Sequence, residues 1–226
     1  MIRKLHAAGV GNGERRGILA QARASYVIAI AGPVGAGKTT LAQAVAHELS
    51  DATILQFDHY ERVTEQSIEQ VRDWMEGGAD LDAIAIPGLA EALQALKEGR
   101  AVTDPMTGAM IPARKYILFE TQFGRRHAAT GRYIDLMIWV DTPLDVALAR
   151  KVRQFAAALE GSDPAAMRSF GPWLHGYLGN YLDVVAGLLR IQKKSVGTGA
   201  DVVVDGERDV LTLQQEIAGL VREKLP

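Results

Sequence analysis

The sequence contains no cysteine, which excludes disulfide bonds, thiolate metal sites and a cysteine nucleophile. It also lacks a long apolar run: the segment Tyr26–Ala31 is far shorter than the ~20 residues that a membrane-spanning helix needs. The first 25 residues are basic but have no apolar core, so we do not expect a signal peptide. Neither charge dominates, because the formal net charge is −2, which gives no electrostatic reason to expect a nucleic-acid or membrane partner. We therefore expect a cytoplasmic protein.

The composition is that of an ordinary globular protein. Its 226 residues, 48% apolar and 23% charged, fit one domain over residues 26–226, preceded by an extension over residues 1–25. Apolar runs predict five strands, at residues 26–31, 53–57, 116–119, 134–140 and 201–205. Helical spacing and helix-start residues predict helices at 14–24, 38–49, 61–75, 87–98, 143–159, 163–194 and 210–224.

The alternation of these elements predicts an α/β fold. Strands that alternate with helices indicate a doubly wound, five-stranded parallel sheet between two layers of helices. Prolines and glycines between residues 101 and 114 interrupt the alternation, and we interpret them as a β-hairpin excursion. Asp141, Thr142 and Pro143 resemble a helix start with proline at the first helical position.

A glycine-rich motif lies between the first predicted strand and the first predicted helix. Residues 32–39 read GPVGAGKT, which matches the phosphate-binding pattern G-x-x-x-x-G-K-[ST]. Glycines allow the backbone N–H groups to surround phosphate oxygens, and the N-terminus of the helix adds its positive dipole end. The predicted nucleotide-binding residues are Gly32, Pro33, Val34, Gly35, Ala36, Gly37, Lys38, Thr39 and Thr40. In this pattern Lys38 reaches the β- and γ-phosphates, the Thr39 hydroxyl binds Mg²⁺, and Thr40 touches the α-phosphate.

The motif predicts a P-loop nucleotide-binding fold but does not by itself name an activity. The sequence has no N-K-x-D motif for guanine recognition, which disfavours a switch GTPase. A motor ATPase usually needs a longer chain or a partner. The short chain therefore favours a kinase that uses ATP and Mg²⁺.

Two carboxylates follow predicted strands, and they strengthen the kinase interpretation. Asp58 comes after strand 53–57 and Glu120 after strand 116–119, so both should face the P-loop at the carboxyl edge of the sheet. A kinase needs acidic groups to orient the attacking hydroxyl, accept its proton and hold Mg²⁺ together with Thr39. Asp58 could instead cap the helix that begins near Glu61, and Glu120 could be a solvated strand end.

The order and spacing of these pieces resemble the uridine kinase and phosphoribulokinase group of P-loop kinases. The resemblance covers roughly residues 26–225. It rests on GPVGAGKTTLA, FDHY, PGLAEALQALKEGR, YILFE, IWVDTPLDVALARKVR and ADVVVDG.

The resemblance implies phosphorylation of a hydroxyl on a small metabolite, with a role for each matching residue. Asp58 would be the base, and Glu120 would position Mg²⁺ through water. Arg150 and Arg153, three apart on one helix face, would belong to a lid near residues 150–170 that neutralises the phosphoryl group. Arg114 would bind the acceptor. Tyr60 falls near the position at which the family has an aromatic residue that contacts the acceptor. Alternatively, Arg150 and Arg153 could simply form a solvated basic face of the helix.

Other features point to the acceptor less directly. Asp73 and Trp74 are candidates to line its pocket, because an indole can stack on a ring. Arg125, Arg126 and His127 could meet an anionic acceptor, although a solvated or structural role is the simpler interpretation. The sequence departs from nucleoside kinases after Asp58 and after Glu120, so a sugar, a sugar acid or a vitamin stays open as the acceptor. A nucleotide-dependent switch protein and a homodimer also stay open.

Overall fold

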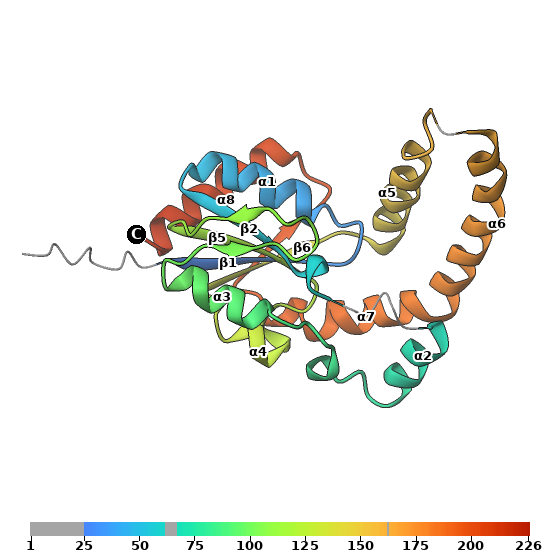
Figure 1. Ribbon diagram of the computed structural model, residues 1–226, viewed down its shortest axis with the longest axis horizontal. Helices are drawn as coiled ribbons and strands as arrows, with labels where there is room; N and C mark the ends of the chain where they lie inside the picture. The colour runs from blue at the N-terminus through green and yellow to red at the C-terminus, as the bar shows by residue number, and fades with distance from the viewer. Residues whose placement is uncertain (1–24, 62–66, 162) are drawn as a thin grey trace, which may run out of the picture.

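The computed structural model describes residues 25–61, 67–161 and 163–226. The predicted helix over 14–24 and the first part of the predicted helix over 61–75 lie outside these residues. Figure 1 shows a central sheet covered by helices on both faces, with a helical arm that projects from one end of it.

The sheet has five parallel strands, as predicted. Its order is β2-β5-β1-β6-β7, so β1 is the central strand and the chain crosses over it to build both halves. The strands are β1 (Tyr26–Ala31), β2 (Ala52–Gln56), β5 (Tyr116–Thr121), β6 (Leu136–Asp141) and β7 (Val202–Asp205). The predicted hairpin is also confirmed, as the antiparallel pair β3 (Val102–Thr103) and β4 (Met110–Ile111).

Alternate side chains of the strands enter two separate cores. Val27 and Ala29 of β1 join one apolar cluster, while Ile28 and Ile30 join the other. Parallel strands are buried on both faces in this way, which is why their sequences are apolar throughout. The first core is closed by α3 (Leu89–Lys97), and the second by α1 (Lys38–Leu49) and α8 (Val210–Lys224). The three-layer α/β/α arrangement is thereby confirmed.

The helical bounds follow local sequence signals. Gly99, with φ of +79°, ends α3, as its sequence predicts. Ser67 and Gln70 form a capping box that starts α2 (Ile68–Glu76). The short helix α4 (Ala128–Gly131) was not predicted.

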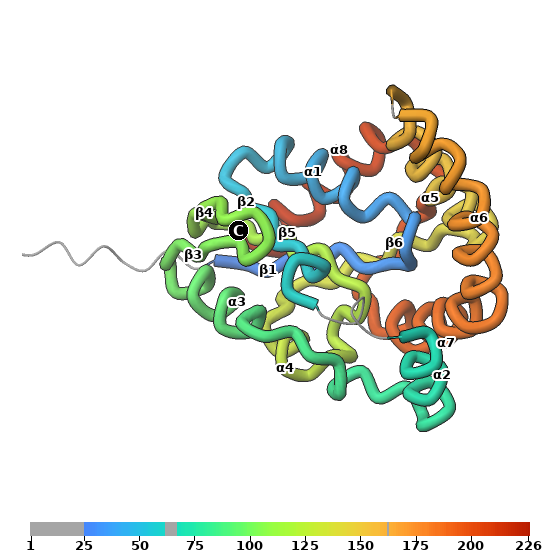
Figure 2. The backbone as a smooth tube through the Cα atoms, turned by 45° about the vertical axis from the view of Figure 1, so that its right-hand side comes forward, coloured from blue at the N-terminus to red at the C-terminus, as the bar shows by residue number. Residues whose placement is uncertain are grey.

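The arm consists of α5 (Leu144–Ala157) and a second, longer helical stretch that returns to the body (Figure 2). That stretch is α6 (Pro164–Asn180), a π-helical turn (Tyr181–Val185) and α7 (Ala186–Ser195). Phe155 of α5 makes edge-to-face contacts with Trp173 and Tyr177 of α6, so these three rings join the two helices. None of the helices in the described parts of the chain is long and apolar enough to cross a membrane.

Three local predictions need correction. Strand β5 runs on to Thr121, so Glu120 lies within the strand rather than after it. Strand β2 ends at Gln56, and Asp58 belongs to the 3-10 helix η1 (Phe57–His59). Pro143 is the N-cap of α5 and not its first helical residue, and Asp141 ends β6, where it pairs with Lys193 of α7 at 2.7 Å. The ends of β2, β5 and β6 are set by pairing with neighbouring strands, which the sequence of a single segment does not reveal.

Leu93 of α3 is fully buried in the first core. Its replacement by alanine should lower the free energy of unfolding by about 2–5 kcal/mol, since the cavity left behind adds to the lost apolar burial. Urea unfolding followed by circular dichroism would measure the change. Leu182, which is 75% exposed, is the matched control. A change at Leu93 no larger than that of Leu182→Ala would contradict the assigned core.

Candidate functional site

The glycine-rich loop closes tightly between β1 and α1. Gly35 and Gly37 have φ values of +81° and +96°, in the left-handed region that favours glycine. A Cβ added at Gly35 would lie 2.2 Å from the main-chain oxygen of Ala147 in α5. Helix α1 begins at Lys38, so its free N–H groups face the loop. This arrangement is a cradle for an anion.

Lys38 carries a buried positive charge beside this cradle. Its side chain is 7% exposed, and its Nζ donates a hydrogen bond to the main-chain oxygen of Pro33 at 3.2 Å. Desolvation by burial lowers the pKa of Lys38, while the negative charges of Glu120 and Asp58 act in the opposite direction. A phosphate group would supply further negative charge where the ammonium lacks water.

Glu120 joins the sheet to the start of α1. Its Oε1 accepts a hydrogen bond from the Thr39 hydroxyl at 2.8 Å, and its Oε2 accepts one from Gln56 Nε2 at 3.3 Å. The residue is 6% exposed, so it is no solvated strand end. Strand pairing places it between Ile30 of β1 and Gln56 of β2. The Thr39 hydroxyl and the Glu120 carboxylate are thus paired oxygen ligands of the kind that Mg²⁺ takes beside a bound triphosphate.

Asp58 lies at the same edge of the sheet as Glu120, in η1, which follows the neighbouring strand β2. Its side chain is exposed, and its Oδ1 accepts a hydrogen bond from Gln122 Nε2 at 3.0 Å. Asp58 does not cap α2, which begins at Ile68 with Ser67 as its N-cap. Its charge acts on Lys38.

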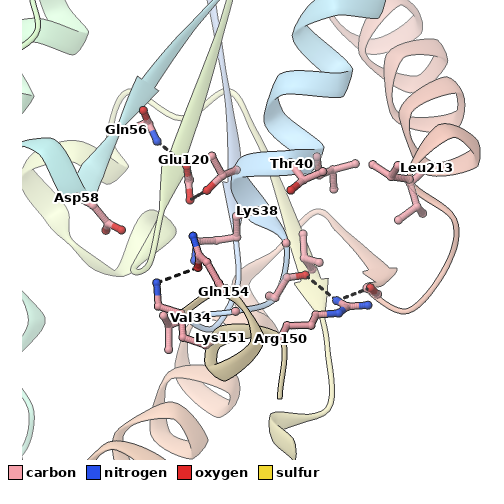
Figure 3. A pocket seen from close by; sticks show the side chains of 18 of the residues that line it. Val34, Lys38, Thr40, Gln56, Asp58, Glu120, Arg150, Lys151, Gln154 and Leu213 are labelled. Atoms are coloured by element: carbon pink, nitrogen blue, oxygen red, sulfur yellow. Dashed lines mark hydrogen bonds between the residues drawn. The ribbon is translucent and has the colours of Figure 1, made fainter. Parts of the chain in front are cut away.

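These groups line one cavity of about 630 Å³, hereafter the P-loop cavity. Figure 3 shows Lys38 between Glu120 on one side and Lys151 and Gln154 of α5 on the other. The P-loop residues that line the cavity are Val34, Gly35, Ala36, Gly37, Lys38, Thr39 and Thr40. Gly32 and Pro33 are buried beneath them. In the described parts of the chain, no group of three or more His, Asp or Glu side chains is placed to hold a metal by itself.

Helix α5 closes the opposite wall of the P-loop cavity. Arg150, Lys151 and Arg153 all line it, so the structure brings the two predicted lid arginines to the P-loop. Arg150 Nη1 donates to the main-chain oxygens of Ala36, at 3.4 Å, and Gly206, at 3.0 Å. Arg150 therefore braces the loop in this structure, whereas Arg153 is exposed at the cavity.

The loop after β7 also lines the site, although no residue of it was among the predicted site residues. Gly206 and Arg208 line the P-loop cavity, and Arg208 forms a two-pronged ion pair with Glu216 of α8. A Cβ at Gly206 would lie 2.0 Å from the Thr142 hydroxyl oxygen, so glycine is required there. Its position after a predicted strand was the one feature of the sequence that could have indicated this role, because ligands of such sheets bind at the carboxyl ends of the strands.

The four residues predicted to bind the acceptor are not brought together. Tyr60 is buried, and its hydroxyl has no hydrogen-bond partner within the described parts of the chain. Trp74 lines a different cavity, described below, and Asp73 is exposed on α2 and lines neither cavity. Arg114 is exposed two residues before β5 begins, at the edge of the sheet opposite the P-loop. Arg114 lines neither cavity, and its predicted role in binding the acceptor stays a prediction.

The basic segment after β5 has a structural explanation. Arg125 pairs with Asp201 at 2.6 Å, and His127 is 3% exposed and hydrogen-bonded to Thr130. Arg126 is exposed, and it lies outside the lining of the P-loop cavity.

Comparison with known families supports the nucleotide site and leaves the family open. The model of the ATPase family associated with various cellular activities (AAA) matches residues 28–87, a minority of the chain that includes β1, the P-loop and α1. No curated protein matches the sequence.

Solved structures of kinases resemble the chain only distantly. Shikimate kinase from Acinetobacter baumannii is 19% identical, with a TM-score of 0.48, over 89% of this chain and 95% of the other. A possible uridine kinase from Bacillus stearothermophilus is 14% identical, with a TM-score of 0.49, over 80% and 89%. A sugar kinase from Janibacter is 13% identical, with a TM-score of 0.44, over 88% and 95%. The fold is that of a P-loop nucleotide-binding protein. Membership of the uridine kinase group stays a prediction.

Gly35 offers a direct test of the loop geometry. Gly35→Ala should lower the free energy of unfolding by at least about 1–2 kcal/mol, the cost of a left-handed backbone, and should abolish tight ATP binding. Denaturant unfolding and calorimetric ATP titration would measure both effects. Gly176, inside α6 with open space around an added Cβ, is the matched control, and Gly176→Ala should stabilise the protein by up to about 1 kcal/mol. Wild-type stability and ATP affinity in Gly35→Ala would refute the loop conformation.

The charge balance around Lys38 gives a second test. Glu120→Gln removes a negative charge that favours the ammonium, so the pKa of Lys38 should fall further below 10.5. Titration of lysine side-chain ¹³C resonances by NMR would measure it. Glu98→Gln, on the exposed end of α3, should leave the pKa of Lys38 unchanged. A pKa that stays constant or rises in Glu120→Gln would show that the two groups do not interact as described.

Proposed function

We propose that this protein is an ATP-dependent small-molecule kinase that transfers the γ-phosphoryl group to a hydroxyl. The observation that carries the proposal is the convergence of Lys38, Glu120 and Asp58 on the P-loop cavity. A nucleotide-binding protein that only switches needs the P-loop and a metal ligand. A phosphotransferase needs in addition an acidic group beside the reacting phosphate, and Asp58 is such a group.

The donor half of the reaction is assigned to the loop and to Lys38. Backbone N–H groups of residues 34–39 and the N-terminus of α1 bind the phosphates of ATP. Lys38, desolvated before the nucleotide arrives, neutralises the β- and γ-phosphates at little reorganisation cost. Thr39 and Glu120 would hold Mg²⁺ through their side-chain oxygens, and the ion would supply positive charge that offsets the negative charge of the phosphates.

The acceptor half is assigned to Asp58. Its carboxylate orients the attacking hydroxyl and accepts its proton as the phosphoryl group moves. Lys151 and Arg153 line the cavity from α5 and are placed to neutralise charge on the transferred group. The chemical character of the acceptor does not follow from these groups, which only contact phosphate, metal and a hydroxyl.

A matched pair of variants tests this assignment. Asp58→Asn should lower acceptor-dependent ADP formation by about 10²–10⁴-fold, the usual contribution of a general base, and leave the Kd for ATP within about twofold. A coupled assay for ADP across nucleosides, sugars, sugar acids and vitamin alcohols would measure the first, and calorimetry the second. Asp183→Asn, in the exposed π-helical turn of the arm, should keep wild-type turnover.

Two results would count against the proposal. If no acceptor raises ADP formation by the wild-type protein above its basal rate, phosphoryl transfer to a small alcohol is wrong, and an ATP-dependent binding protein becomes the better explanation. If Asp58→Asn loses ATP binding together with turnover, Asp58 belongs to the nucleotide site and is not the base.

A further inference from the structure

A second cavity lies next to Asp58: it is lined by Phe57, the preceding residue, and by Gln122, which is hydrogen-bonded to Asp58. Its volume is about 280 Å³, and we refer to it as the aromatic cavity. Its apolar lining is Phe57, Val71, Trp74, Ala83, Ile84, Phe123 and Leu188. The rings of Phe57 and Phe123 meet edge to face, with centroids 5.2 Å apart, and form one wall. Its polar lining is Glu61, Gln70 and Gln122.

Gln122 is the link between the two cavities. It lines the aromatic cavity, and its Nε2 donates to Oδ1 of Asp58, which lines the P-loop cavity. An ionised carboxylate can only accept hydrogen bonds, so the amide nitrogen must face Asp58. Gln122 therefore holds one oxygen of Asp58, and within the described residues no hydrogen bond is found to the other oxygen.

The backbone of Gln122 is itself held in place. Its main-chain oxygen accepts a hydrogen bond from Nε2 of Gln192, a residue of α7 that is 4% exposed. Thr121, the last residue of β5, accepts hydrogen bonds on its hydroxyl from the N–H groups of Phe123 and Gly124. Gln122 thus leaves the sheet on a turn that is fixed on both sides, and its side chain has a defined direction.

We propose that the aromatic cavity is the acceptor site, that its occupant is an alcohol with an apolar ring as its body, and that Gln122 is the positioning residue that aims Asp58 at the hydroxyl. The inference rests on the proposed function for its chemistry. Rings and aliphatic side chains make up most of the lining, so a ring gains stacking and apolar burial there. An open-chain polyol would give up hydrogen bonds to water and regain few.

Binding can be tested without turnover, because Trp74 lines the aromatic cavity. Its indole N–H, which donates to the main-chain oxygen of Asp80 at 2.8 Å, gives a resolved NMR signal that Trp74→Phe would identify. Benzyl alcohol should shift this signal in a saturable way, whereas glycerol and glycerol 3-phosphate at the same concentration should not. The indole of Trp173 on α6, in the arm, is the internal control and should stay in place. No shift at Trp74 with benzyl alcohol, or an equal shift with glycerol 3-phosphate, would overturn the assigned acceptor class.

The positioning role is tested by two substitutions with the best acceptor found for the wild-type protein. Gln122→Leu keeps the shape and removes the hydrogen bond, so kcat should fall roughly 10²-fold while the Kd for ATP is unchanged. Gln122→Glu places a second carboxylate against Asp58, which also faces Lys38, Glu120 and Lys151 around the P-loop cavity. Like charges disfavour ionisation, so the acidic limb of the pH–kcat profile should move up by about one pH unit.

A matched control separates this effect from added charge alone. Gln94→Glu introduces the same change beside Glu98, to which Gln94 donates on the exposed side of α3, and should not move the profile. An unshifted acidic limb in Gln122→Glu, with circular dichroism showing a folded protein, would overturn the positioning role. If the wild-type protein phosphorylates no alcohol, the proposed function fails, and the Trp74 signal alone still decides whether the cavity takes a ring-bearing alcohol.

Discussion

The buried charge of Lys38 is the constraint around which the carboxyl edge of the sheet is organised. An ammonium group that is withdrawn from water must find negative charge or hydrogen-bond acceptors nearby. The Pro33 carbonyl accepts a hydrogen bond from Lys38, and the carboxylates of Glu120 and Asp58 act on it through their charges. Burial nevertheless lowers the pKa of Lys38. The site is thus left with a deficit of negative charge, which is what a polyphosphate supplies. Catalysis by electrostatic stabilisation depends on such groups being placed before the substrate arrives.

The arm serves this site from two directions. Leu144 and Leu148 of α5 and Val34 of the P-loop pack against one cluster of Tyr181, Ala186 and Leu189. The Ala147 carbonyl of α5 leaves no room for a side chain at Gly35. Farther along, Gln192 of α7 holds the main chain of Gln122, and Leu188 completes the aromatic cavity. The same helical excursion therefore contacts both the P-loop and the turn that carries Gln122. Its π-helical turn lies between these two contacts, where a break in regular hydrogen bonding often marks a functional site.

Much of the framework could be predicted because its signals are local. The run of apolar residues before Gly32 and the glycine spacing up to Lys38 define a strand, a loop and a helix without reference to the rest of the chain. Helices α1 and α8 begin and end as predicted for the same reason. Arg114, by contrast, lies before the start of β5, far from the P-loop, because a hairpin returns the chain to the start of β5 and not to its end. Nothing in the local sequence gives the direction of that return.

The sequence by itself determined that a P-loop lies at the end of a buried strand and that Asp58 and Glu120 reach the same edge of the sheet. Those conclusions follow from residue type and from the parallel direction of the strands. Only the tertiary structure decided the partners: that Glu120 bonds Thr39, that Arg150 braces Ala36 and Gly206, and that Gln122 connects Asp58 to an apolar cavity. These contacts join residues between 56 and 114 positions apart in the chain. The strand order β2-β5-β1-β6-β7 sets them, and that order arises from the packing of all the elements together.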